Sequence, residues 1–134
     1  MNAEGIVNYM FENDPFSQWL GIKLDSIALG KVQLSMKVSS EMCNGFGIAH
    51  GGICFSLADS ALAFAANTHE KKAYSVETSI QMLKSVRLGD ELKAESRELV
   101  LREDSGVYEI KIYSSNELVS TFQGTVYRGE AWEL

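Results

Sequence analysis

The sequence is poor in cysteine, proline and histidine. Its 134 residues include two cysteines, one proline and two histidines. Two cysteines cannot build the disulfide framework of a small secreted domain, so we expect a reducing, cytoplasmic location. Cys43, Cys54, His50 and His69 do not have the spacing of a zinc site, so we expect no metal and no separate cofactor.

Long apolar runs are also missing. The longest candidate, residues 53–66, is interrupted by Asp59 and is shorter than the roughly 18 residues of a membrane span. The N-terminus has no basic segment followed by an apolar core, so we expect no signal peptide. The net charge of −6 argues against broad binding to nucleic acid or to an anionic membrane. A local cationic groove remains possible, and its candidates, which could equally be scattered solvated cations, are Lys71, Lys72, Lys84, Arg87, Arg97, Arg102 and Arg128.

Periodicity and turn residues divide the chain into short elements. The alternation of apolar and polar residues in KVQLSMKV and VYEIKIY predicts strands with one wet face. Helical patterns cover residues 3–13, 14–20 and 51–67. Strands are expected at residues 22–28, 31–38, 73–83, 91–101, 107–113 and 118–128, with turns at Gly89-Asp90, Ser105-Gly106 and Ser115-Asn116. We find no repeat and no linker, which predicts a single domain over residues 1–134.

The helix predicted over residues 51–67 is apolar nearly all round, so the fold must enclose it. The short turns between the strands favour antiparallel neighbours. We therefore predict an α+β fold in which a curved antiparallel sheet wraps around this central helix. The bulky stripe that should face the chain's own sheet is Ile53, Leu57, Ala61 and Phe64. The small stripe that should lie near a subunit interface is Ser56, Asp59, Ala63 and Ala66.

Asp59 is the most informative residue in the chain. A lone carboxylate seldom lies in an apolar helix, because removing an unpaired charge from water costs several kcal/mol. The segment before this helix ends in Gly51 and Gly52, whose amides should point out of the helix N-terminus. A carboxylate and free amides at the positive end of a helix dipole are the two parts needed to hydrolyse an activated acyl group.

These residue types suggest distinct roles. The Gly51 amide would hold the developing oxyanion, and Asp59 would act either as a general base on water or as the nucleophile. Partial burial should raise the pKa of Asp59 and make it a better base. Asn44 could hydrogen-bond the water or the carbonyl, and His50 could orient the loop before the helix.

The spacing of these residues predicts a homodimer. Gly51 and Asp59 are eight residues apart, about 12 Å along a helix, so one carbonyl cannot easily touch both groups of the same chain. If two such helices lie antiparallel across a twofold axis, Asp59 of one subunit approaches Gly51 of the other. We therefore expect active sites that are shared between two subunits.

Each of these features also has a plain structural alternative. Asp59 could accept hydrogen bonds from a buried loop, the glycine pair could simply allow a tight connection into the helix, and Asn44-Gly45 could be a turn. A thiolate mechanism is a further alternative, because His50 and Cys54 are four residues apart near the helix N-terminus. Nothing in the sequence orients His50 for that task, and a buried cysteine is more often a small apolar residue.

The segment from Asn44 to Asn67, NGFGIAHGGICFSLADSALAFAAN, combines HGG, a following LAD and an asparagine six residues before the histidine. With DPFSQWLGI at residues 14–22 and RLGDEL at residues 87–92, it resembles the hotdog-fold acyl-CoA thioesterases of the phenylacetic acid degradation (PaaI-like) family. The resemblance implies a hotdog fold, a twofold dimer and usually a homotetramer of two dimers. It also implies metal-free hydrolysis of acyl-CoA, typically phenylacetyl- or hydroxyphenylacetyl-CoA, with coenzyme A as part of the substrate.

Carried over residue by residue, the resemblance places the catalytic positions on Asp59, Gly51, Asn44 and His50. It implies substrate contacts from Gly52, Ser75, Lys84, Arg87 and Arg128. Two departures, Ser85 in place of a frequent proline and Leu62 in place of a frequent phenylalanine, bear on the loop and the acyl pocket. Two alternatives stay open: a non-catalytic acyl-CoA-binding or regulatory hotdog domain, and a hotdog dehydratase that uses His50.

Overall fold

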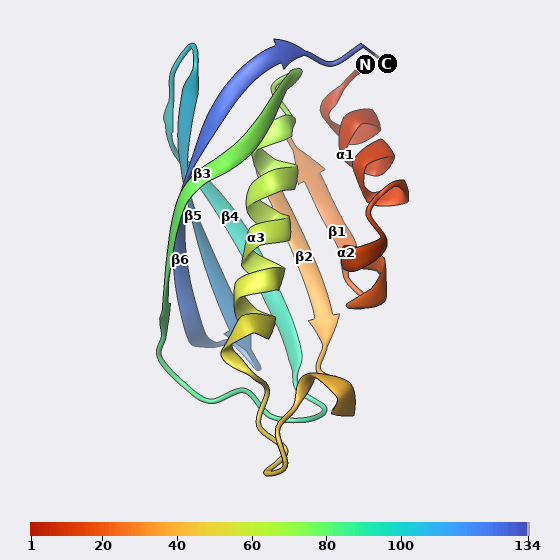
Figure 1. Ribbon diagram of the computed structural model, residues 1–134, viewed down its shortest axis with the longest axis vertical. Coiled ribbons are helices and arrows are strands. Elements are labelled where there is room, and N and C mark those ends of the chain that lie inside the picture. Colours follow the sequence, from red (N-terminus) through yellow and green to blue (C-terminus); the bar gives the residue numbers. More distant parts are fainter. Residues whose placement is uncertain (134) are drawn as a thin grey trace.

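A six-stranded sheet curves around the long helix α3 in the computed structural model, which describes residues 1–133 (Figure 1). The elements in chain order are α1 (Ala3–Glu12), α2 (Pro15–Trp19), β1 (Lys23–Ala28), β2 (Lys31–Lys37), the 3-10 turn η1 (Ser40–Met42), α3 (Gly51–Asn67), β3 (Lys71–Met82), β4 (Glu91–Leu101), β5 (Ser105–Ser114) and β6 (Glu117–Ala131). None of the helices within this range is long and apolar enough to cross a membrane.

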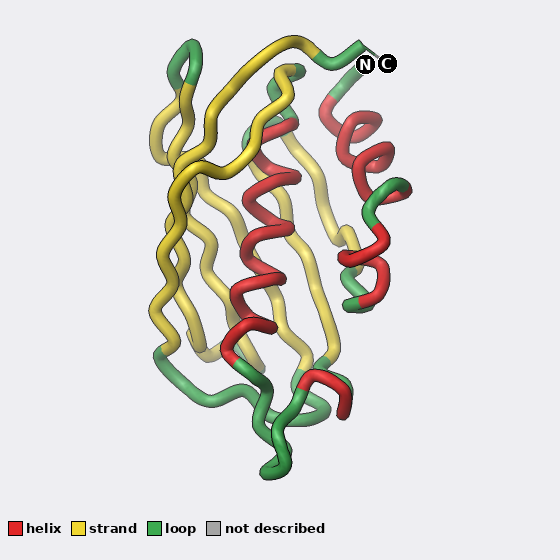
Figure 2. Tube along the Cα trace, in the orientation of Figure 1, coloured by secondary structure: helices red, strands yellow, loops and turns green. Residues whose placement is uncertain are grey.

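The strands lie in the order β1-β2-β4-β5-β6-β3, and every neighbouring pair is antiparallel. Helix α3 packs against the concave face of this sheet, and α1 and α2 lie beside β1 at one end (Figures 1 and 2). The predicted α+β class and the curved sheet around a central helix are confirmed, and the arrangement is the hotdog fold.

The turn predicted at Ser105-Gly106 is wrong. Both residues belong to β5, and the chain turns earlier, where the Arg102 N–H donates to the Ser105 carbonyl at 2.8 Å. Gly106 lies in a tightly packed place instead, because a Cβ at this position would lie 3.1 Å from the Tyr108 ring and 3.3 Å from a Val126 methyl group. A glycine beside a serine looks the same in sequence whether it serves a turn or a close contact.

Helix α3 buries one side and leaves part of the other exposed. On the bulky stripe, Leu57, Ala61 and Phe64 are buried and Ile53 is partly buried against the same core. Phe64 packs on Phe11 of α1, so the stripe is enclosed by α1 as well as by the sheet. On the small stripe, Ser56, Asp59 and Ala63 stay partly exposed, whereas Ala66 is buried. Most of the small stripe is therefore open to a partner.

The loop that enters α3 is fixed by a second loop from the other side of the molecule. The Ala49 N–H donates to the Val86 carbonyl at 2.8 Å, and the Leu88 N–H donates to the Gly47 carbonyl at 3.0 Å. Figure 2 shows these two green loops together at the end of the molecule where α3 begins. The β3–β4 loop thereby holds the start of α3 in place.

Candidate active site

The N-terminus of α3 opens into a cavity. His50 is the N-cap residue with extended backbone (φ −61°, ψ 145°), and its imidazole makes no capping hydrogen bond. Gly51 is therefore the first helical residue, and its N–H has no acceptor within the helix. The cavity has a volume of about 300 Å³, and its lining includes His50, Gly51, Cys54, Met82, Lys84 and Ser120.

Gly51 cannot be enlarged without moving its neighbour. A Cβ built on Gly51 would lie 2.6 Å from the Met82 Sδ atom, so the methionine side chain occupies the space that a larger residue would need. Glycine at this position thus lets the Met82 side chain pack against the first turn of α3. At Gly51 the positive end of the helix dipole, a free backbone amide and an open cavity therefore occur together.

Asp59 lies further along α3, with its side chain partly exposed on the small stripe. Burial raises the pKa of the Asp59 carboxyl above its usual range, and the negative charge of Asp14 raises it further. Within residues 51–67 the other titratable side chain is Cys54. Asp59 is thus a carboxylate with increased basicity, although it does not line the cavity at Gly51 in the single chain.

Asn44 shapes the loop that leads to α3. Its Oδ1 atom accepts hydrogen bonds from the Phe46 N–H at 2.9 Å and from the Ile48 N–H at 3.2 Å. This is the geometry of the turn alternative. Within residues 1–133 its Nδ2 group makes no hydrogen bond, so the side chain can shape the loop and still donate to a ligand.

His50 is held by its backbone. Its N–H donates to the Met42 carbonyl at 3.0 Å, while the imidazole is exposed at the rim of the cavity. The neighbouring Gly52 is exposed on the same first turn of α3. The loop is thus oriented by main-chain bonds, and the imidazole remains free to meet a ligand.

Two of the predicted coenzyme A residues lie near the cavity. Lys84 lines it and forms an ion pair with Glu117 at 2.6 Å, with both side chains about half exposed. Arg87 is exposed on the same loop, and its backbone N–H donates to the Asp90 carboxylate at 3.0 Å.

The structure brings neither the third predicted coenzyme A residue, Arg128, nor the predicted substrate residue Ser75 to the cavity within one protomer. Ser120, which lines the cavity, pairs with Met82, whereas Arg128 pairs with Ala73 at the opposite end of the β3–β6 ladder. The Arg128 guanidinium donates to the Arg102 carbonyl, and Ser75 is exposed on the edge strand β3. Contacts from Ser75 and Arg128 stay predictions.

Ser120 lines the cavity although the sequence did not mark it, and Cys54, marked only as an alternative nucleophile, lines it as well. Burial raises the pKa of the Cys54 thiol, and the nearby Ser120 hydroxyl offsets this only in part. The thiol therefore stays protonated at neutral pH, which disfavours the thiolate mechanism. Ser120 is buried, and its hydroxyl makes no hydrogen bond within the part of the chain that the structure describes. The sequence signal that could have identified Ser120 is a serine at an inward-facing position of β6, among apolar residues.

Leu62, one of the two departures, does not border this cavity. It is fully buried, and its Cδ2 atom would lie 2.5 Å from a Cβ at Gly124. Ser85, the other departure, does line the cavity. Position 85 therefore borders the cavity, whereas position 62 lies where α3 packs against β6.

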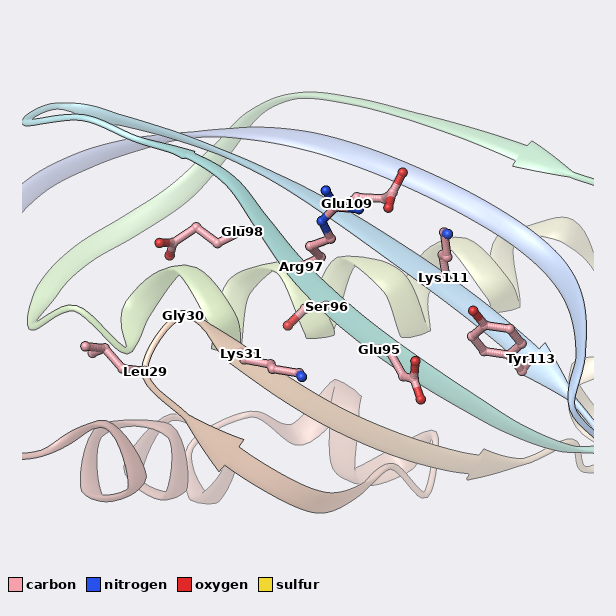
Figure 3. A pocket seen from close by; sticks show the side chains of 10 residues that line it. All are labelled: Leu29, Gly30, Lys31, Glu95, Ser96, Arg97, Glu98, Glu109, Lys111 and Tyr113. Atoms are coloured by element: carbon pink, nitrogen blue, oxygen red, sulfur yellow. The ribbon is translucent and has the colours of Figure 1, made fainter.

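A larger cavity lies elsewhere. Its volume is about 440 Å³, and it opens over β4 and β5 and the β1–β2 turn (Figure 3). Strand alternation places Glu95, Arg97, Glu109 and Lys111 on the face of the sheet opposite α3. None of the residues that line this cavity lies at a helix N-terminus. The smaller cavity at Gly51 is therefore the better candidate for acyl chemistry.

At one end of this larger cavity, the Glu98 carboxylate contacts the side chains of both Tyr108 and His69. It accepts a hydrogen bond from the Tyr108 hydroxyl at 2.7 Å and pairs with His69 at 2.5 Å. His69 thus has a structural partner. No group of three or more His, Cys, Asp or Glu side chains suited to a metal ion occurs within residues 1–133.

Comparison with known proteins assigns the family. Residues 46–121, the segment that contains the α3 cavity and Asp59, match the thioesterase superfamily. The chain belongs to this superfamily. Acyl-coenzyme A thioesterase PaaI of Escherichia coli is 35% identical over 120 residues, which cover 89% of this chain and 86% of that protein.

Solved structures agree with this assignment. The structure of the E. coli PaaI protein from the phenylacetic acid degradation operon matches with a TM-score of 0.94 and 34% identity, covering 96% of this chain and 95% of that one. A mutant of phenylacetic acid degradation protein PaaI from Thermus thermophilus matches with a TM-score of 0.83 and 32% identity, covering 87% of this chain and 100% of that one. The predicted PaaI-like family and thioester hydrolase class are confirmed.

Proposed function

We propose that the protein hydrolyses acyl-coenzyme A thioesters to the free acid and coenzyme A, using Asp59 of one protomer and the Gly51 N–H of its partner. The observation that carries this proposal is the pair formed by a half-buried carboxylate of raised pKa and a free amide at an open helix N-terminus. They lie about 12 Å apart on the same helix, too far for one carbonyl to touch both.

Exposed surfaces on the single chain support the dimer. The partly exposed small stripe of α3 allows a second helix to come close. Strand β3 is an unpaired edge of the sheet, and its Tyr74 and Val76 side chains are about 60% exposed. An edge with unpaired backbone groups and apolar side chains is a template for pairing with another strand. We infer that two protomers join along this edge, and that two such dimers form the homotetramer.

The reaction follows from the two groups. The Gly51 N–H donates to the thioester carbonyl oxygen, and Asp59 removes a proton from water as the water oxygen bonds to the carbonyl carbon. The C–S bond then breaks, and the coenzyme A sulfur leaves with the electron pair and takes up a proton. In the alternative, Asp59 itself attacks and forms an anhydride that water cleaves. Detection of ¹⁸O in the Asp59 carboxylate after a single turnover in H₂¹⁸O would show the anhydride route, because water that attacks the Asp59 carbonyl of the anhydride leaves its oxygen there, whereas direct attack of water on the thioester places ¹⁸O only in the released acid.

Asp59 is tested by removing its charge. We expect Asp59→Asn to fold normally and to lose about 10²- to 10⁴-fold in kcat for every acyl-CoA that the protein hydrolyses. Thiol release measured with a chromogenic disulfide gives the rate. Unchanged turnover would remove Asp59 from the mechanism.

The Gly51 amide is tested by a proline substitution. Proline lacks the N–H and is favoured at the first position of a helix, and the extended backbone of His50 suits a residue before proline. We expect Gly51→Pro to lose about 10²- to 10³-fold in kcat. Gly51→Ala is the matched control: it displaces the same Met82 side chain but keeps the N–H, so it should retain most of the activity.

The acyl group is proposed by similarity to the PaaI relatives. An arylacetyl group, phenylacetyl or hydroxyphenylacetyl, is the preferred substrate that we propose, with Lys84 and Arg87 as the cations nearest the cavity for the coenzyme A phosphates. A thiol-release panel of arylacetyl, short-chain and long-chain coenzyme A esters should give the highest kcat/KM with the arylacetyl esters. Binding of all esters without thiol release would favour the non-catalytic domain instead.

We also propose that the reaction requires no metal ion or other cofactor and takes place in the cytoplasm. Activity that survives dialysis against EDTA tests the first statement. Detection of the protein in the cytoplasmic fraction of lysed cells tests the second.

A further inference from the structure

Helix α2 is tied to α3 beside Asp59. Asp14 is the N-cap of α2: its Oδ1 atom accepts from the Ser17 N–H at 3.0 Å, and its Oδ2 atom accepts from the Ser17 hydroxyl at 2.6 Å. The Ser17 hydroxyl lies 2.8 Å from the Ser60 hydroxyl, and both serines are buried. Ser60 is the residue after Asp59, so a chain of three hydrogen-bonding side chains fixes Asp14 next to the turn of α3 that carries Asp59.

We propose that Asp14 is a positioning residue of the active site, which the Asp14–Ser17–Ser60 chain holds so that its carboxylate sets a second negative charge beside Asp59. This inference rests on the proposed function, because it needs Asp59 as the base. A capping residue need not be charged, since asparagine and serine cap helices as well as aspartate does. The capping role alone therefore does not require the negative charge.

The other titratable groups around α3 leave this role to Asp14. Cys54 on α3 and Tyr108 on the sheet face both have a raised pKa because of burial, and both are neutral at pH 7. Tyr108 is also hydrogen-bonded to Glu98, which pairs with His69. On α1 and β1 the acidic groups are Glu4 and Glu12, which are exposed, and Asp25, which accepts from the Ser35 hydroxyl. On the strands that pack against α3, Glu109 lies on the face of the sheet opposite α3, and the remaining carboxylates are exposed: Glu77, Glu91, Glu95, Glu117 and Glu130.

The consequence is a stronger base at Asp59. A nearby like charge disfavours the ionised form of a carboxyl, so it raises the pKa of Asp59 in the same direction as burial does. A more basic carboxylate removes a proton from water more readily once it is ionised. The same effect makes Asp59 harder to ionise in acid.

Asp14→Asn separates the charge from the shape. Asparagine keeps the Oδ1 cap for Ser17, and its amide can donate to the Ser17 hydroxyl, so we expect the fold to be retained. The acid limb of the kcat profile should move to lower pH, and kcat on the plateau should fall roughly threefold because the base is weaker. Asp14→Asn should therefore have a higher kcat than the wild type at pH values below the acid limb and a lower kcat on the plateau, so that the two pH profiles cross.

Two further variants and one spectroscopic measurement make the result decisive. Asp14→Ser, which caps without charge or aspartate shape, should move the limb as far as Asp14→Asn does. Asp25→Asn removes an acidic charge from β1 and should leave the limb in place. ¹³C NMR of the Asp59 carboxyl, assigned by comparison with Asp59→Asn, should show a lower titration midpoint in Asp14→Asn.

Each other outcome overturns the inference. An Asp14→Asn profile that is unchanged, or lowered equally at every pH, would show that Asp14 is only a cap. An equal shift in Asp25→Asn would show an effect of net charge, and a shift in Asp14→Ser alone would show an effect of shape. Failure of the proposed function looks different, because Asp59→Asn would then keep its turnover in the same assay.

Discussion

At the scale of single residues, Asp59 occupies a position that serves chemistry better than stability. Its carboxyl is partly buried on a helix that is otherwise apolar or small, and both burial and the Asp14 charge oppose its ionisation. A group whose pKa is raised in the folded state stabilises the fold below the pKa of the unfolded chain. That contribution is lost as the pH rises through the folded-state pKa. At neutral pH the ionised carboxylate is therefore a cost to folding.

We predict that Asp59→Asn is more stable than the wild type at pH 7 although it is inactive. The gain in the free energy of unfolding should reach up to about 1 kcal/mol, limited by the partial exposure of Asp59. Chemical denaturation at several pH values should show this difference shrinking to zero as the pH falls below the usual carboxyl range. Asp104→Asn, which changes an exposed turn residue, should show no such trend. A variant less stable than the wild type at pH 7 would contradict the argument.

Cys54 gives a second prediction at this scale. Its thiol is buried and has a raised pKa, so it is a small packing residue. Cys54→Ala should keep kcat within about twofold and lower the free energy of unfolding by roughly 1 kcal/mol through the lost volume. Loss of activity in a folded Cys54→Ala variant, or rapid inactivation by iodoacetamide, would restore the thiolate mechanism.

At the scale of elements, Asn67 joins the end of α3 to the sheet. Its Nδ2 group donates to the Ala63 carbonyl at 2.8 Å and to the Ala73 carbonyl at 2.9 Å. Its Oδ1 atom accepts from the Ala73 N–H at 2.9 Å and from the Trp132 indole at 3.0 Å. The side chain is buried, so this single amide satisfies polar groups of α3, β3 and the C-terminal segment.

We predict that Asn67→Ala is strongly destabilising. Buried donors and acceptors would be left without partners, at a cost of about 2–4 kcal/mol, which a thermal or urea unfolding curve can measure. Asn116→Ala, at an exposed turn between β5 and β6, should cost less than Asn67→Ala by more than about 1 kcal/mol. Equal effects of the two variants would show that the Asn67 network contributes little.

Asn67 also illustrates what the sequence could and could not predict about the fold. Alternation and helical periodicity are local patterns, so the helix over residues 51–67 and all six strands were predicted, with ends within a few residues. The pairing of β6 with β3 joins segments far apart in the chain, and no local pattern marks Asn67 as the residue between them. The Ser105-Gly106 turn was wrong for the same reason, since the close contacts that Gly106 makes with Tyr108 and Val126 arise only in the folded sheet.

The candidate site divides in the same way. Asp59 and Gly51 stand out in the sequence because a charge in an apolar helix and a glycine pair before a helix are local anomalies. Ser120 reaches the cavity from β6, and Asp14 is linked through Ser17 to Ser60, the residue after Asp59. These two are ordinary residues in sequence, and only the tertiary structure places one in the cavity and the other beside the turn of α3 that carries Asp59.

At the scale of the whole molecule, the account depends on the assembly. The single chain presents the Gly51 amide and the Asp59 carboxylate on one helix, an unpaired β3 edge and a half-exposed small stripe on α3. All of these are explained together if a second copy packs across a twofold axis. We therefore expect sedimentation to find dimers or tetramers at concentrations where the enzyme is active.

Mixing two inactive variants tests the shared site most directly. Asp59→Asn and Gly51→Pro protomers, co-expressed in equal amounts with different affinity tags, should form mixed dimers in which one of the two sites has both an intact Asp59 and an intact Gly51 amide. The statistical mixture should recover roughly a quarter of the wild-type kcat per protomer, although each variant alone is nearly inactive. Purified mixed dimers with no more activity than the two parents would contradict a site built from two subunits.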